Sequence, residues 1–188
     1  MAISSLKQAL SAWILLVPLC LPAFFSAFAR PEVLDSAANG FTIQHTVQID
    51  RSPQYVYNVL VEGIGKWWSS DHTFSGDASN LSIDARPNGC FCERLGDGAG
   101  VRHLSVVFAS PGRRLGLTGG LGPLQQAGVN GSLGIDLSQN GSGTLLKLTY
   151  AVGGYHPGGL DKWAQPVDSV LVEQMERLKR YSETGSAE

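Results

Sequence analysis

Residues 166–181 read PVDSVLVEQMERLKRY. Apolar side chains recur in this stretch every three or four residues, which is the pattern of a helix with one apolar face. Pro166 suits the first turn of such a helix, and Asp168 places a negative charge near the positive end of the helix dipole. The stripe consists of Val167, Val170, Leu171, Gln174, Met175 and Leu178. We therefore expect a long amphipathic helix to close the chain, and its stripe must be buried against other elements.

The chain before this helix is expected to form strands. Residues 41–50 alternate apolar and polar side chains, which predicts a half-buried strand. Ser52, Pro53 and Gly63 carry the start and stop signals of a helix, and residues 64–68 are expected to add a second short one. Further strands are expected at 81–85, 90–95, 101–108, 114–118, 129–137 and 146–152.

This order predicts an α+β fold. Strands joined by short turns form an antiparallel sheet, and a long curved sheet closed by one helix leaves an interior space. We expect a curved antiparallel sheet of about six to seven strands wrapped on the long C-terminal helix, with two short helices after the first strand.

The composition indicates one domain with an ordinary core. The chain has 188 residues, of which 43% are hydrophobic and 16% are charged, and its net charge is −2. This balance gives no basic footprint for nucleic acid, so no nucleic-acid partner is expected. The sequence contains no Gly-x-Ser-x-Gly elbow, nucleotide-binding loop or metal-ligand triad. No cofactor or metal is therefore expected.

The first residues have the pattern of a secretion signal. Lys7 precedes an apolar run over 9–28, which ends in the small-residue site Ala27-Phe28-Ala29. We expect cleavage after Ala29 and a secreted or periplasmic protein without stable membrane insertion. The alternative is an uncleaved anchor, since the run is nearly long enough to span a membrane. Within the mature chain we expect a polar, irregular leader over 30–39, the domain over 40–182 and a disordered tail over 183–188.

Two cysteines remain after cleavage. Cys90 and Cys92 lie two apart in an expected strand, so their side chains share one face. They can be two small residues on a strand, a strained disulfide permitted by an oxidising compartment, or metal ligands that still need partners.

Three titratable residues are candidates for chemistry. Glu93 shares its strand face with Phe91, and burial there would raise its pKa and make it a candidate acid, base or ligand hydrogen-bonder. The alternative is a solvated or paired carboxylate at a sheet edge. His103 faces either solvent or the interior, because its strand has two possible parities. His45 lies on an apolar strand face, where a histidine is ordinarily a satisfied core group.

The other candidates are apolar and aromatic side chains around the interior space. Trp67 and Trp68 are adjacent, so we expect one in the core and the other at a cavity or the surface. Residues 119–126 are apolar yet broken by glycine and proline, which is typical of the lip of a pocket. The candidate ligand-binding residues are Trp67, Trp68, Phe91, Glu93, His103, Leu121, Tyr150, Tyr155 and Leu171.

Four short motifs occur in an order typical of one superfamily. They are Ser52-Pro53-x-x-Val56-Tyr57-x-x-Leu60 followed by Lys66-Trp67-Trp68, Pro87-x-Gly89-Cys90-Phe91-x-Glu93, Val106 to Pro111 with Leu115, and Val167-Asp168-x-Val170-Leu171 through Arg177-Leu178. With them the chain resembles the START-like (SRPBCC) superfamily, in particular activator-of-Hsp90-ATPase homologues and polyketide cyclase-like proteins. Leu121-Gly122-Pro123-Leu124-Gln125 and Thr149-Tyr150-x-Val152-Gly153-Gly154-Tyr155 resemble a secreted bacterial subgroup.

The resemblance covers 41–181 and implies a helix-grip fold with a deep cavity between the sheet and the C-terminal helix. Members of the superfamily bind lipids, hormones or hydrophobic metabolites, and some cyclise or dehydrate polyketides. Three hypotheses follow. The first is a binding protein for a small hydrophobic or aromatic molecule. The second is a cyclase, dehydratase or hydrolase that uses Glu93 with His103 or His45. The third is a protein-interaction module with a filled interior.

Overall fold

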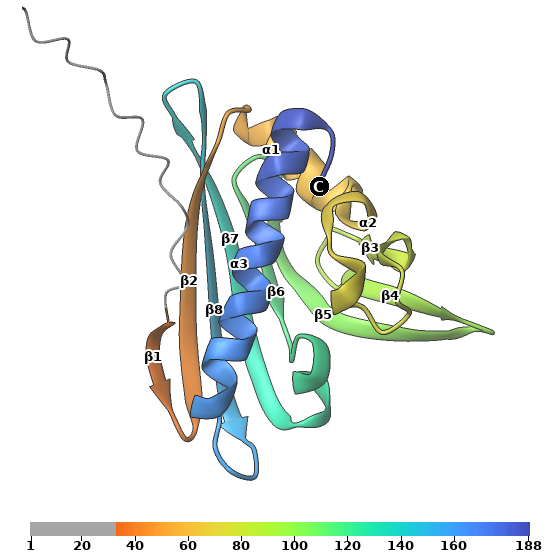
Figure 1. Cartoon of the computed structure of the whole chain (residues 1–188), viewed down its shortest axis with the longest axis vertical. Coiled ribbons are helices and arrows are strands. Elements are labelled where there is room, and N and C mark those ends of the chain that lie inside the picture. Colours follow the sequence, from red (N-terminus) through yellow and green to blue (C-terminus); the bar gives the residue numbers. More distant parts are fainter. Residues whose placement is uncertain (1–32) are drawn as a thin grey trace, which may run out of the picture.

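An antiparallel sheet of eight strands curves around one long helix (Figure 1). The computed structural model describes residues 33–188, so the predicted signal peptide lies outside the described residues. The strand order across the sheet is β1-β2-β8-β7-β6-β5-β4-β3. The strands are β1 Val33–Ala37, β2 Gly40–Ile49, β3 Leu81–Ile83, β4 Cys90–Gly96, β5 Ala99–Ser110, β6 Arg114–Thr118, β7 Gly128–Asn140 and β8 Gly143–Tyr155.

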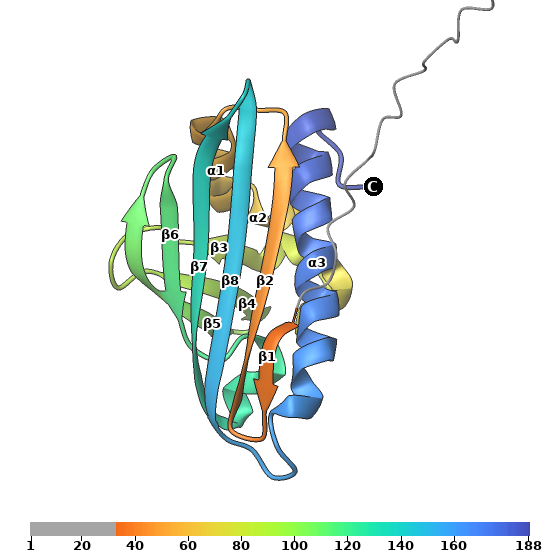
Figure 2. The same ribbon diagram turned by 90° about the vertical axis from the view of Figure 1, so that its left-hand side faces the viewer.

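The helices lie mainly on the inner face of the sheet. Seen from the side, β6, β7, β8 and β2 follow one another across the sheet and α3 runs beside β2 (Figure 2). No helix within residues 33–188 is both long enough and apolar enough to span a membrane. The helices are α1 Pro53–Glu62, α2 Ile64–Trp67 and α3 Asp161–Thr184, with short 3₁₀ turns η1 Ser70–His72, η2 Ala78–Asn80 and η3 Gly122–Gln126. The predicted α+β helix-grip architecture is confirmed.

The sheet has one strand more than the upper expected count. Residues 33–37, expected to belong to an irregular leader, form β1 and pair antiparallel with β2. Most of β1 is exposed, so its side chains carry no alternating pattern that sequence reading could detect. Backbone hydrogen bonds to β2 hold it in place, and such bonds are independent of side-chain type.

The start of α1 follows its sequence signals. The Ser52 hydroxyl accepts a hydrogen bond from the Tyr55 N–H at 3.4 Å, and Pro53 is the first helical residue. At the other end, the Gly63 N–H donates to the Val59 carbonyl. These contacts satisfy backbone groups that helix ends leave without partners.

The closing helix is longer than predicted at both ends. It begins at Asp161, so Pro166 lies inside α3 and not in its first turn. Leu160 and Ala164, both buried, secure the extra turn, and the Leu160 N–H donates to the Ala38 carbonyl at 2.9 Å. Tertiary burial thus outweighs the backbone hydrogen bond that the proline removes.

The predicted disordered tail over 183–188 is also wrong. Helix α3 continues to Thr184 and ends at Gly185, which adopts the left-handed conformation of a C-terminal cap. Beyond it the chain folds back, because Arg180 donates to the Ala187 carbonyl at 2.7 Å and the Ala187 side chain is buried.

Helix α3 is fixed to the sheet by a buried pair. His45 Nε2 on β2 lies 2.9 Å from Asp168 Oδ1 on α3, and neither side chain is exposed. His45 is a core residue, as expected, but it is not a satisfied one: its contact with Asp168 lacks hydrogen-bond geometry, and neither ring nitrogen has a hydrogen-bond partner among the described residues. Asp168 does not act as an exposed charge at the helix start, because it points inward to the histidine. The pair sets where α3 crosses the sheet.

Removing one partner of this pair should be costly. We expect Asp168→Ala to lower the free energy of unfolding by about 3 kcal/mol or more, because the buried imidazole loses its partner. Urea denaturation followed by circular dichroism measures this. Asp161→Ala removes an exposed aspartate from the same helix and should cost less than about 1 kcal/mol. Equal losses in the two variants would show that the pair has no special role.

Candidate functional site

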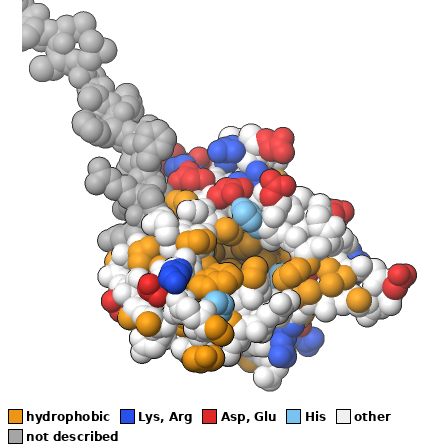
Figure 3. Space-filling model, turned by 60° about the horizontal axis from the view of Figure 1, so that its bottom comes forward, with side chains coloured by type: hydrophobic (Ala, Val, Ile, Leu, Met, Phe, Trp, Pro, Cys, Tyr) orange, Lys and Arg blue, Asp and Glu red, His pale blue; other side chains and the backbone are white. Residues whose placement is uncertain are grey.

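A cavity of about 290 Å³ lies between the sheet and the first half of α3. Figure 3 shows the hollow, with hydrophobic side chains gathered around its mouth. Its volume is near the lower end of the range for small-molecule sites, which is about 300–1,000 Å³. The lining residues are Trp68, Asp71, His72, Thr73, Phe74, Phe91, His103, Leu121, Gly122, Pro123, Trp163, Pro166, Val167, Val170 and Leu171.

The other half of the grip space is filled. Towards α1 and α2 the interior holds only a small void of about 30 Å³, lined by core side chains. Trp67 belongs to that part, where it is buried and donates from Nε1 to the Val59 carbonyl at 3.1 Å. The domain is therefore stabilised at one end and hollow at the other.

Aromatic rings form one wall of the cavity. Phe91 on β4 lies between Trp68 and His103, with ring centroids 5.4 Å and 4.9 Å away. Phe74, in the segment between η1 and η2, stacks on the His103 ring at 5.8 Å and is 49% exposed. Rings at such distances attract one another beyond simple burial of area. The wall reaches from the core to the mouth of the cavity.

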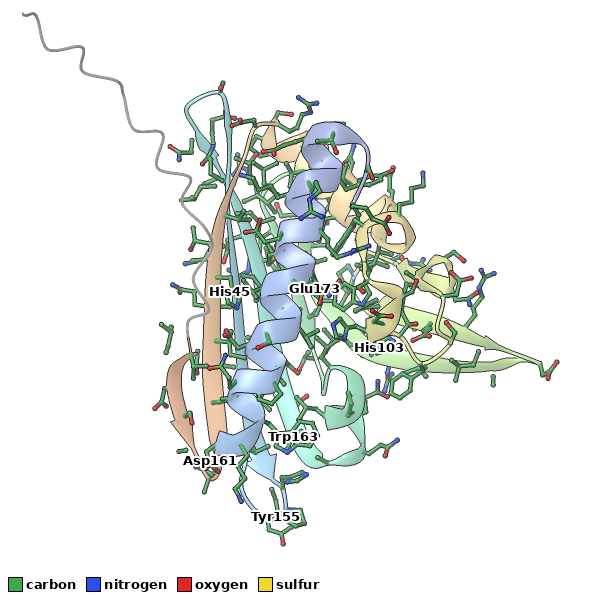
Figure 4. All side chains as sticks on the ribbon, viewed as in Figure 1. His45, His103, Tyr155, Asp161, Trp163 and Glu173 are labelled. Carbon is green, nitrogen blue, oxygen red and sulfur yellow. A yellow bond between two sulfur atoms is a disulfide. The ribbon has the colours of Figure 1, made fainter. Side chains whose placement is uncertain are left out.

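A β-bulge turns His103 into this wall. On β4 the neighbours Phe91 and Cys92 pair with Leu104 and Arg102 on β5, so His103 is the extra residue between them. A bulge re-aims side chains, and here both His103 and Leu104 are buried although they are adjacent in the strand. In Figure 4 the buried histidines His45 and His103 lie on opposite sides of α3. The sequence left open whether His103 faces solvent or the interior. Because of the bulge, His103 faces the cavity.

Glu93 lies directly behind His103. The predicted inward face of β4 is confirmed, because Phe91 and Glu93 are both buried. Glu93 Oε2 is 2.9 Å from His103 Nε2, and its oxygens also accept hydrogen bonds from the Phe74 and Ser75 N–H groups. The carboxylate is thus surrounded by donors.

These donors overturn the expected direction of the Glu93 pKa. Burial by itself would raise the pKa, but hydrogen bonds from Ser75, from the Phe74 N–H and from His103 together lower it below its usual value. Hydrogen bonds to the charged form of a carboxyl favour that form. Glu93 is therefore ionised at neutral pH and serves as an acceptor, not as a general acid.

His103 is uncharged at neutral pH. Burial lowers its pKa, and the opposing hydrogen bond and charge of Glu93 do not reverse the shift. Because the carboxylate accepts from Nε2, the proton of the neutral ring is on Nε2. Nδ1 is then an acceptor, and it lies 3.3 Å from Nε2 of Gln125. The site therefore combines a held carboxylate, a neutral imidazole and one basic ring nitrogen.

The structure brings together part of the predicted site. Trp68, Phe91, His103, Leu121 and Leu171 line the cavity, and Glu93 supports it from behind. The two tryptophans divide as expected, with Trp67 in the core and Trp68 at the cavity. Two tyrosines in the predicted set do not line it: Tyr150 is buried elsewhere in the core, and Tyr155 is 73% exposed.

Tyr155 and Tyr150 differ in role. Tyr155 lies at the end of β8, at the lower tip of the molecule in Figure 4.

The Tyr150 hydroxyl donates to the Gly119 carbonyl and accepts from the Leu121 N–H, both at 3.0 Å. Burial raises the pKa of Tyr150 to about 12. A Cβ on Gly131 would lie 2.5 Å from the Tyr150 ring, so only glycine fits there. Tyr150 thus holds the segment that carries the Leu121 wall.

Several lining residues were not predicted. Phe74 lies in a polar segment that reads as a loop, and its only signal is that it is an isolated aromatic residue there. Trp163 is a wall residue because α3 begins at Asp161, before the predicted helix start, and Pro166 lines the cavity from within the helix. At the mouth, His72 Nε2 lies 3.0 Å from Glu173 Oε2 and connects η1 to α3.

Cys90 and Cys92 form a disulfide on the outer side of β4. Of the three alternatives that the sequence left open for these cysteines, the structure therefore has the disulfide, and not two separate small residues or a pair of metal ligands. Within residues 33–188 no three side chains of the types that bind metals are grouped together.

Comparison with known proteins identifies the fold. No model of a known protein family matches the sequence, and no curated protein matches it. Solved structures do match. EF2215, a conserved protein of unknown function from Enterococcus faecalis, has a TM-score of 0.56 and 17% identity, covering 80% of this chain and 75% of that one. CalU16 from Micromonospora echinospora has a TM-score of 0.53 and 17% identity, covering 76% and 74%.

A third match is the Aha1 dimer from Colwellia psychrerythraea, with a TM-score of 0.56 and 18% identity over 77% of this chain and 97% of that one. Identities this low establish the fold alone. The chain shares the helix-grip fold of these structures. Its membership of the superfamily that the sequence motifs resemble stays a prediction. Its relation to a secreted subgroup stays a prediction.

The Glu93–His103 pair should make stability depend on pH. Because the pKa of His103 is lowered in the folded state, the unfolded chain takes up this proton first as pH falls. Stability should therefore decrease as pH falls below about 6.5, the ordinary pKa of histidine, and the lowered pKa of Glu93 should add to the loss below about 4.3. Urea unfolding at pH values between 7 and 5 should show a shallower fall for His103→Gln than for the wild type. An unchanged slope in His103→Gln would contradict this assignment.

Loss of the Tyr150 hydroxyl should loosen the cavity wall. We expect Tyr150→Phe to lower the free energy of unfolding by about 1–3 kcal/mol, because two buried backbone groups lose their partner. Chemical denaturation measures the loss, and Tyr155→Phe, at an exposed tyrosine, should leave stability unchanged. If the two variants were equally stable, the hydroxyl would not be holding the 119–121 segment.

Proposed function

We propose that this protein binds one small apolar molecule in the cavity beneath the first half of α3. The observation that carries the proposal is an open cavity whose wall is mainly aliphatic and aromatic, with His103 held by Glu93 as its buried polar group and the other polar side chains, Asp71 to Thr73, in one segment of the lining. Small-molecule sites ordinarily have this composition: apolar walls for affinity and a few fixed polar atoms for orientation.

The shape of the interior argues against the interaction-module hypothesis. That hypothesis expects side chains to close the grip space, and they do so only around α1 and α2. A ligand bound in the cavity would make packing contacts with the apolar side chains that line it.

The binding is proposed to occur outside the cytoplasm. The signal pattern with Ala27-Phe28-Ala29 supports export, and cleavage after Ala29 would release a chain that begins just before β1. A disulfide between Cys90 and Cys92 is compatible with an oxidising compartment. N-terminal sequencing of the exported protein tests the proposal: a chain that starts at Arg30 supports it, and retention of the apolar run argues for an anchor.

A second function is favoured by one observation. His103 is held by an ionised carboxylate and has its other nitrogen free of a proton, which is the arrangement of a general base. In this reading Glu93 orients the imidazole and stabilises the imidazolium that forms on proton transfer. The test is to incubate a ligand recovered from the protein with wild type and with Glu93→Gln, and to compare the mass of the recovered compound. An unchanged mass together with an unchanged chromatographic retention after incubation with the wild type excludes catalysis on that compound.

A larger side chain in the cavity should weaken binding. Val170 is half-buried and lines the cavity, whereas Val172 lies on the same helix outside it. We expect Val170→Phe to weaken binding of the neutral probe N-phenyl-1-naphthylamine at least tenfold, because the new ring occupies the ligand's space. Probe fluorescence measures the affinity. Val172→Phe adds the same ring outside the cavity and should bind as the wild type does; equal binding by all three proteins would place the site elsewhere.

A further inference from the structure

The charges around the cavity define the kind of molecule that it can take. We propose that the site selects an uncharged ligand that carries a hydrogen-bond donor, such as a phenol or an alcohol on an apolar body, and that it rejects carboxylates. This inference rests on the proposed function and concerns the same cavity. It names the His103 Nδ1 atom as the point of recognition and Gln125 as the group that the ligand displaces.

The fixed charges around the cavity are negative. Among the described residues that line the cavity, none is a lysine or arginine, so no fixed cation is present to pair with an anionic ligand. The fixed charge nearest to the aromatic wall is the Glu93 carboxylate, which is buried behind His103. At the mouth, Asp71 and Glu173 are also acidic, and His72 lies against Glu173. A carboxylate that entered would lose its hydration without gaining a counter-ion, which is strongly unfavourable.

The tautomer of His103 sets the direction of its hydrogen bond to a ligand. Glu93 already accepts two backbone N–H groups and can only accept from His103, which fixes the ring proton on Nε2. The other ring nitrogen, Nδ1, carries no proton, so it can accept a hydrogen bond but cannot donate one. A ligand hydroxyl or N–H group therefore matches it, and an ether or carbonyl oxygen does not.

Gln125 occupies the place at Nδ1 that a ligand donor would take. The present partner of Nδ1 is the amide of Gln125 at 3.3 Å, which is long for a hydrogen bond. Gln125 is an exposed side chain on η3, and this turn also carries the wall residues Gly122 and Pro123. Its amide can return to water at little cost. A ligand donor that replaces it would form a buried hydrogen bond in apolar surroundings, where such bonds discriminate well.

The test uses three probes of nearly equal size at neutral pH: 2-naphthol, which donates a hydrogen bond; 2-methoxynaphthalene, which cannot; and 2-naphthoate, which is an anion. Isothermal titration calorimetry gives the three dissociation constants. We expect 2-naphthol to bind about fivefold more tightly than 2-methoxynaphthalene, as one net hydrogen bond allows. We expect 2-naphthoate to bind at least tenfold more weakly than 2-naphthol.

Two pairs of variants assign these preferences to atoms. Gln125→Ala removes the competing donor and should increase the preference for 2-naphthol over 2-methoxynaphthalene at least twofold, whereas Gln126→Ala, at the neighbouring exposed amide, should not change it. Glu93→Gln removes the buried charge and should reduce the ratio of the dissociation constants of 2-naphthoate and 2-naphthol at least fivefold. Asp71→Asn removes an exposed charge at the mouth and should reduce it less, because solvent screens that charge.

Each outcome has a separate meaning. Binding of 2-naphthoate as tight as that of 2-naphthol would overturn the inference, as would equal binding of the naphthol and its methyl ether in wild type and Gln125→Ala. In both cases the proposed function would stand, because the cavity still binds apolar molecules. If none of the three probes bound, the proposed function itself would fail, and the inference with it.

Discussion

The hydrogen bond between Glu93 and His103 is the interaction on which the site depends. It exists because a bulge in β5 inserts His103 between residues that pair regularly with β4, and so turns the ring inward. The same carboxylate accepts the backbone N–H groups of Phe74 and Ser75 and thereby fixes the segment that covers the aromatic wall. The buried charge of Glu93 thus determines the tautomer of the His103 ring, the position of Phe74 and the sign of the electrostatic potential in the cavity.

The rest of the fold supplies a rigid frame for this pair. The two ends of the grip space differ: core side chains and Trp67 fill the end near α1 and α2, and the other end stays open. The His45–Asp168 pair fixes α3 on β2 close to the hollow end, and the Tyr150 hydroxyl holds the segment before η3. These polar contacts are buried and far from solvent, so they specify where the cavity walls stand while apolar burial supplies most of the stability.

Sequence patterns predicted the elements well and the site in part. Alternation and helical periodicity respond to which face is buried, so they located β2, β4 and the body of α3, and they placed Phe91 and Glu93 on the inner face. They could not locate β1, because backbone hydrogen bonds alone pair it with β2. They could not locate the bulge at His103 either, because a bulge interrupts the alternation from which strand faces are predicted. The prediction that the pKa of Glu93 is raised was wrong because the carboxylate accepts hydrogen bonds from backbone N–H groups of a segment distant in the sequence. Tyr155 was misplaced because an aromatic residue at a strand end gives no sign of which way it points.

The proposed binding is tested most directly by native mass spectrometry of the protein, whose proposed mature form is residues 30–188, purified from the cells that produce it. We expect a co-purifying small molecule that is released on unfolding, carries no carboxylate and has an exchangeable O–H or N–H proton. A protein that retains an aliphatic or aromatic acid would contradict the charge argument. A bare protein that also shows no thermal stabilisation by neutral apolar compounds would contradict the central claim that the cavity is a binding site.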